Sequence, residues 1–117
     1  NDGLRGFSLE EISTNLQEII NQLISQNSNI LLVPMRLPPN YGKSYNDRFT
    51  EIYSELATSH DLVLTRFILQ DIADKVDLMQ SDGIHPLADA QELMLDIIWS
   101  SLLPELEKER ESANEAL

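Results

Sequence analysis

With 117 residues, the chain is long enough for one domain and too short for two. Its net charge of −12 would be repelled by a nucleic-acid duplex or an anionic bilayer, so neither is expected as a partner. The absence of cysteine excludes disulfides, thiolate zinc sites and cysteine nucleophiles. No apolar run is long enough for stable insertion into a membrane.

The first predicted element is an amphipathic helix that ends near residue 26. Ser8 is the expected N-cap, and Glu11 closes a capping box. Apolar residues then recur at spacings of three and four, at Ile12, Leu16, Ile19, Ile20, Leu23 and Ile24. The uninterrupted apolar run that follows, residues 30–35, predicts a strand buried on both faces, as in a parallel sheet.

A second helix and a second strand come next. Ser44 and Asp47 are the predicted capping pair of this helix. Its apolar stripe consists of Phe49, Ile52, Tyr53, Leu56 and Ala57. The short apolar run 62–64 predicts the second strand, which gives a βαβ unit with two parallel strands.

The last part of the chain is predicted to hold short helical turns over 68–79 and then a final helix. Pro86 is expected to open this helix, because proline suits the first helical position. A core face follows, made of Leu93, Met94, Ile97, Ile98 and Leu102, with Trp99 beside it. We expect residues 1–104 to be the domain part and 105–117 to be an acidic tail, either a helical extension or frayed.

This order of elements indicates the α/β class, but with too few strands. Two parallel strands do not make a stable sheet, since such sheets have more strands and are covered on both faces. The pattern is therefore typical of the second half of an α/β domain. Made alone, the chain is expected to associate with a second polypeptide that bears the missing strands, to self-associate through the strand edge, or to fold poorly.

The candidate chemistry lies in the stretch "SDGIHP" at residues 81–86. An Asp-x-x-His turn lets the carboxylate of Asp82 accept a hydrogen bond from Nδ1–H of His85. That bond fixes the tautomer and leaves Nε2 free to take a proton from a nucleophile. Three segments can reach the carboxyl ends of the strands, where functional groups gather in parallel sheets: residues 1–3, 36–42 and 82–86.

Two other interpretations stay open on the residues alone. The Asp-x-x-His turn could be incidental in a non-catalytic helical interaction module. A metal-dependent hydrolase using Asp82 and His85 would need a third ligand. The only other histidine, His60, is expected to face the opposite edge of the sheet, so it is not that ligand.

Three motifs together resemble the SGNH (GDSL) hydrolase family, in particular its bacterial thioesterase I, lysophospholipase and arylesterase-like branch. These motifs are "NDGLRG" at 1–6, "RLPPNYG" at 36–42 and "DGIHP" at 82–86. The resemblance implies a three-layer α/β/α sandwich around a parallel sheet, a serine esterase or thioesterase activity on acyl substrates, and no cofactor. It also implies a periplasmic or secreted location, although no export signal is visible in this chain.

The resemblance further implies roles for individual residues. Asp82 and His85 match the acid and base of a Ser-His-Asp triad, and Asn1 matches an oxyanion-hole asparagine. The implied substrate-binding positions are Leu4, Arg5 and Gly6, in a mobile loop beside the acyl site, together with Leu37, Pro38 and Ile84. Neither the family's Gly-Asp-Ser nucleophile block nor the glycine of its oxyanion hole occurs here. We therefore expect the serine to lie upstream, and this chain alone to be inactive.

Overall fold

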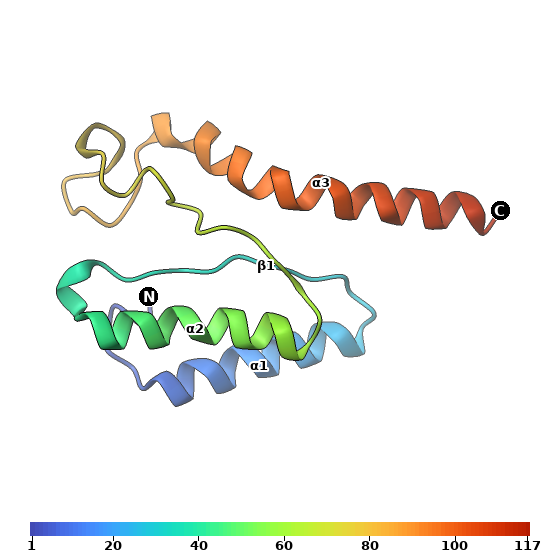
Figure 1. Ribbon diagram of the computed structural model, residues 1–117, viewed down its shortest axis with the longest axis horizontal. Coiled ribbons are helices and arrows are strands. Elements are labelled where there is room, and N and C mark those ends of the chain that lie inside the picture. Colours follow the sequence, from blue (N-terminus) through green and yellow to red (C-terminus); the bar gives the residue numbers. More distant parts are fainter. The chain divides into compact units, whose positions relative to one another are not determined.

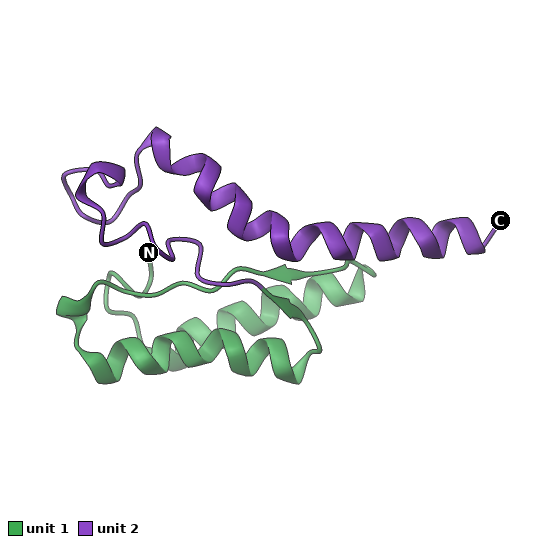
Figure 2. Cartoon of the chain, turned by 45° about the horizontal axis from the view of Figure 1, so that its top comes forward, with its two compact units in different colours: residues 1–64 green, residues 65–117 purple.

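A computed structural model describes all of residues 1–117 (Figure 1). The helices are α1 (Leu9–Ser25), α2 (Lys43–Ser59) and α3 (Gln91–Glu115), and the strands are β1 (Leu31–Leu32) and β2 (Val63–Leu64). The order helix, strand, helix, strand, helix is as predicted. The chain forms two compact units, which we describe separately: unit 1 is Asn1–Leu64 and unit 2 is Thr65–Leu117 (Figure 2).

Helix α1 begins and ends close to the predicted positions. The Ser8 hydroxyl accepts a hydrogen bond from the backbone N–H of Glu11 at 3.1 Å, which confirms the predicted N-cap. Ile12 and Ile20 are buried on its inner face, but Ile19 and Ile24 of the predicted apolar stripe are exposed. The stripe is therefore only partly covered within this chain.

The two strands pair in parallel, with Leu31 opposite Val63 and Leu32 opposite Leu64. The parallel pairing confirms the prediction, but the predicted length of 30–35 is wrong for β1. Pairing is limited to the short stretch that β2 offers, and β1 has no second neighbour. For the same reason its side chains are half-buried rather than buried on both faces.

The predicted capping pair of α2 is wrong. The helix begins at Lys43, and its N-cap is Gly42, which makes no side-chain cap and has a φ of 88° that suits glycine. Asp47 instead accepts a hydrogen bond from Nζ of Lys43 at 2.5 Å. A short 3₁₀ turn, η1 (Pro39–Tyr41), leads into the glycine and sets this start.

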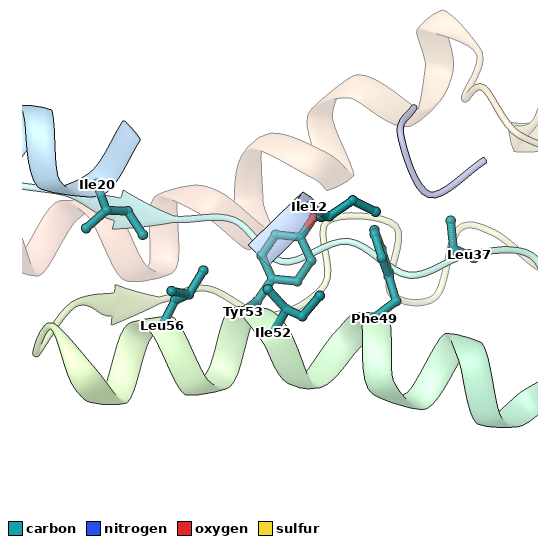
Figure 3. Packing of buried hydrophobic residues seen from close by; sticks show 7 residues of the cluster. All are labelled: Ile12, Ile20, Leu37, Phe49, Ile52, Tyr53 and Leu56. Carbon is teal, nitrogen blue, oxygen red and sulfur yellow. The ribbon is translucent and has the colours of Figure 1, made fainter. Parts of the chain in front are cut away.

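The inner face of α2 provides most of the core of unit 1. All five residues of its predicted stripe are buried. Phe49 and Tyr53 pack edge to face, with ring centroids 5.6 Å apart. Figure 3 shows the cluster: Ile12, Ile20, Leu37, Phe49, Ile52, Tyr53 and Leu56.

Unit 2 has a small core beneath a run of turns, and then the long helix α3. Leu69, Ile72, Met79 and Ala90 form that core. The 68–79 region contains turns and the 3₁₀ helix η2 (Val76–Leu78), as predicted. No helix of the chain is both long and apolar enough to cross a membrane.

The prediction that Pro86 opens the last helix is wrong. Pro86 forms an isolated antiparallel bridge with Met79, and the N–H of Leu87 donates to the carbonyl of Leu78 at 2.8 Å. These contacts hold residues 86–87 in extended backbone. The 3₁₀ helix η3 (Ala88–Ala90) then leads into α3, which begins at Gln91 and continues through the charged tail.

Candidate active site

A closed loop carries the aspartate and histidine singled out in the sequence. The bridge between Met79 and Pro86 joins its two ends. Inside it, the N–H of Gln80 donates to the carbonyl of His85 at 2.7 Å, and the N–H of Gly83 donates to the carbonyl of Gln80 at 2.9 Å. Gly83 has a φ of 66°, a conformation that glycine adopts without strain. The loop therefore returns the chain within a few residues.

The carboxylate of Asp82 is bonded through both of its oxygens. Oδ1 accepts the backbone N–H groups of Ile84 at 2.9 Å and of His85 at 3.0 Å. Oδ2 lies 2.6 Å from Nδ1 of His85. The predicted hydrogen bond between the two side chains is thus confirmed. The bond to the His85 ring, followed by the two backbone bonds, lowers the pKa of Asp82 from 3.8 to about 2.

This geometry defines the tautomer of His85. Because Asp82 is ionised at neutral pH, it can only accept hydrogen bonds, so Nδ1 of His85 carries the proton. The lone pair of a neutral His85 is then on Nε2, which has no hydrogen-bond partner in the structure. The His85 side chain is 61% exposed. A ring held in this way can accept a proton at Nε2.

The predicted oxyanion residue, Asn1, belongs to a hydrogen-bonded turn of unit 1. Its carbonyl accepts the N–H of Arg5 at 3.0 Å, and the carbonyl of Asp2 accepts the N–H of Phe7 at 3.1 Å. Asn1 lies at a cavity of about 200 Å³. That cavity is lined by Asn1, Asp2, Gly3, Ile12, Asn15, Leu16, Ile19, Phe49 and Tyr53.

The other predicted site residues are distributed over both units. In unit 1, Leu4 is half-buried against the core, whereas Arg5 and Gly6 are exposed. Leu37 is buried and Pro38 is half-buried. In unit 2, Ile84, which precedes His85 in the sequence, is half-buried. The structure brings Asp82, Ile84 and His85 together in one loop, and it places Asn1, Leu4–Gly6, Leu37 and Pro38 in unit 1.

Two residues that support these segments were missed by the sequence analysis. Asn46 holds the backbone of Leu37 at both ends: its Oδ1 accepts the N–H at 2.9 Å, and its Nδ2 donates to the carbonyl at 2.6 Å. Gln80 donates from Nε2 to the carbonyl of Pro86 at 3.3 Å. Neither contact has a signal in the local sequence pattern. No group of three or more His, Asp and Glu side chains gathers as it would around a metal ion.

Comparison with known proteins identifies relatives over most of the chain. No family model matches it. It is 40% identical over 104 residues to thioesterase 1/protease 1/lysophospholipase L1 of Escherichia coli K12, covering 89% of this chain and 50% of that protein. It is 37% identical over 106 residues to an arylesterase of Vibrio mimicus, covering 91% and 53%. The chain thus spans about half the length of the curated relatives it matches.

Solved structures agree with the sequence relatives. The crystal structure of TesA matches with a TM-score of 0.85 and 35% identity, over 89% of this chain and 58% of that one. AlinE4, described as an SGNH-hydrolase family esterase, matches with a TM-score of 0.66 and 39% identity, over 91% and 56%. In sequence and in fold, this chain is therefore similar to the C-terminal part of SGNH-hydrolase family esterases.

Proposed function

We propose that this chain supplies the acid and base of a Ser-His-Asp triad to an enzyme that hydrolyses acyl esters or acyl thioesters. The observation that carries the proposal is the 2.6 Å contact between Oδ2 of Asp82 and Nδ1 of His85. It leaves Nε2 of His85 as an available base on an exposed ring. The substrate class follows the names of the relatives, which are a thioesterase and lysophospholipase and an arylesterase.

In the proposed reaction, a serine hydroxyl from a part of the enzyme outside residues 1–117 attacks the acyl carbonyl. Nε2 of His85 takes the hydroxyl proton and then gives it to the leaving alcohol or thiol, so that an acyl-serine remains. Water attacks the acyl-serine in the same way, with Nε2 again taking and returning one proton. Asp82 stays ionised throughout, because its pKa lies near 2, and it stabilises the imidazolium.

Unit 1 would contribute to binding of the acyl group. We assign the side-chain amide of Asn1 as a donor to the oxyanion that forms on the carbonyl oxygen. Leu4, Leu37 and Pro38, with Arg5 and Gly6, are assigned to the acyl chain on the basis of the motif match, and so is Ile84 of unit 2. Export to the periplasm or beyond is proposed on the same basis.

The experiment compares histidine variants of the enzyme that contains this chain together with its nucleophile. His85→Ala should lower kcat for a p-nitrophenyl ester by about four to six orders of magnitude, as loss of a triad member does. His60→Ala is the matched control, because His60 is the only other histidine of residues 1–117 and caps the end of α2 rather than lying in the Asp82 loop. Equal losses in both variants, or no loss in His85→Ala, would refute the proposed role.

A parallel measurement on residues 1–117 alone tests where the nucleophile lies. This chain should release no more p-nitrophenol than its own His85→Ala variant, since none of its serines lies in a Gly-Asp-Ser context. Turnover that depends on His85 in the isolated chain would mean that the serine is within residues 1–117. In that case the proposed division of the triad would be wrong.

A further inference from the structure

The turn formed by residues 1–7 packs on the core of unit 1 through Gly3 and Leu4, but its second half is exposed. Its own bonds run from Arg5 N–H to the carbonyl of Asn1, from Gly6 N–H to that of Gly3, and from Phe7 N–H to that of Asp2. Arg5 and Gly6 are exposed, and Gly6 has a φ of 73°. An exposed segment of this kind opens readily unless other elements hold it.

Two tyrosine hydroxyls from a distant part of the sequence reach this turn. The hydroxyl of Tyr41 donates to the carbonyl of Leu4 at 2.8 Å, and the hydroxyl of Tyr45 donates to the carbonyl of Phe7 at 2.8 Å. Tyr41 ends η1, and Tyr45 lies in the first turn of α2. Both rings pack against the core of unit 1, so the hydroxyls are held by buried structure.

We propose that Tyr41 and Tyr45 are positioning residues that latch the Leu4–Phe7 segment onto the start of α2. The two bonded carbonyls bracket Arg5 and Gly6, the exposed part of the turn. The two bonds limit the motion of this segment, which the family resemblance implies to be mobile. This inference rests on the proposed function: the latch fixes the position in which Leu4, Arg5 and Gly6 contact the acyl chain.

The two bonds should not contribute equally. The bond from Tyr41 is partly buried, whereas the bond from Tyr45 is exposed. Water competes less well for a buried carbonyl, so removal of the Tyr41 hydroxyl leaves that carbonyl poorly satisfied. Tyr41 is therefore the principal point of the latch, and Tyr45 is the weaker one.

If the two rings had a purely structural role, the expected effect of substituting them would be different. If the rings only fill space, phenylalanine should replace either tyrosine without consequence for the turn. Tyr53 provides the control, because it lies on α2 as Tyr45 does and its hydroxyl takes part in neither of the two bonds to the turn. Tyr53→Phe therefore removes a hydroxyl from unit 1 without touching the latch.

Limited trypsin digestion reports opening of the turn directly, since the Arg5–Gly6 bond lies between the two latched carbonyls. Tyr41→Phe should speed cleavage after Arg5 by about two- to tenfold, the range that one net hydrogen bond supplies. Tyr45→Phe should give a smaller increase, and Tyr53→Phe none. Cleavage after Lys75, in an exposed loop of unit 2, is the internal reference and should keep its rate.

Several results would overturn the latch. Unchanged cleavage after Arg5 in Tyr41→Phe is one, and an equal increase after Arg5 and Lys75 is another, because that signals general loss of stability. If Tyr41→Phe fails to fold, the test rests on Tyr45→Phe. The bond that this variant removes is exposed and lies outside the core, so the variant should fold. An unchanged rate after Arg5 in that variant then refutes the proposal.

The acyl-site part of the proposal has a kinetic readout in the active enzyme. Tyr41→Phe should raise KM for a p-nitrophenyl octanoate ester by about two- to tenfold, and by less for the acetate ester. A merely structural defect would instead lower kcat for both esters alike and refute this part. Absence of any ester hydrolysis would refute the proposed function and leave the digestion result standing.

Discussion

Replacement of Gly3 is expected to be costly because of packing rather than because of backbone conformation. A methyl group at this position would lie 2.8 Å from Cε2 of Phe49 and 2.9 Å from Cδ2 of Leu37, below the 3.0 Å that real contacts of this kind reach. Both neighbours are buried core residues, and the backbone of Leu37 is held on both sides by Asn46. Gly3→Ala must therefore displace the ring or the leucine.

The expected cost follows from overpacking. Extra methyl groups in a packed core cost about 1–3 kcal/mol. Replacement of glycine also stabilises by about 0.4–1 kcal/mol through the unfolded chain, where the backbone conformation permits alanine. We expect a net loss of about 1–2 kcal/mol in the free energy of unfolding for Gly3→Ala.

Gly6→Ala is the matched control in the same turn. Its added methyl group would meet no atom within 4 Å, but its φ of 73° lies in the left-handed region. This variant should lose about 1–2 kcal/mol from backbone strain alone. The two glycines thus give similar losses from different causes, and a second substitution separates them.

The assay is urea unfolding followed by far-ultraviolet circular dichroism, on single variants and on variants combined with Phe49→Leu. The smaller side chain gives the methyl group of Gly3→Ala room, so the two changes together should cost less than their sum. With Gly6→Ala the costs should add. An unaltered free energy for Gly3→Ala, or strict additivity with Phe49→Leu, would refute the packing argument.

Two further predictions concern pH and association. The pKa of Asp82 is lowered from 3.8 to about 2, so the stability that the Asp82–His85 loop draws from it should be present above pH 3.8 and be lost as the pH falls through about 2. Carbon NMR of the Asp82 carboxyl group checks this, and a midpoint near 3.8 would contradict it. Residues 1–117 alone should self-associate, because β1 has only one neighbour and its free edge can pair with another chain. Sedimentation velocity measures this, and a monomer with slow amide exchange at Leu31 and Leu32 would show that the edge is already protected.

The sequence predicted the elements whose signals are local. The apolar stripe of α2 was found in full, because one helix face alone carries its periodicity. The Ser8 cap and the Asp82–His85 bond were also found, and each joins residues three positions apart. Predictions that depended on the surrounding chain were less accurate. The start of α3 was misplaced, because the bridge between Met79 and Pro86 overrides the preference of proline for a helix start.

The supporting residues of the candidate site show the same limit. Asn46 bonds to Leu37 from nine positions away, and Tyr41 and Tyr45 bond to the first turn from 37 and 38 positions away. The residue types alone indicate no partner at such separations. Only the approach of η1 and α2 to the first turn reveals the two tyrosine contacts, and that approach is a property of the folded unit.

The Asp82 carboxylate connects folding of the loop with the chemistry proposed for it. Oδ1 accepts two backbone N–H groups, which closes the turn, and the closed turn brings Nδ1 of His85 to Oδ2. An asparagine could keep the first set of bonds through its single oxygen, but its NH₂ group would then face Nδ1. His85 would have to accept at Nδ1 and carry its proton on Nε2, where the base is needed. We therefore expect an asparagine to keep the backbone bonds of the loop but to abolish the proton transfer proposed at Nε2.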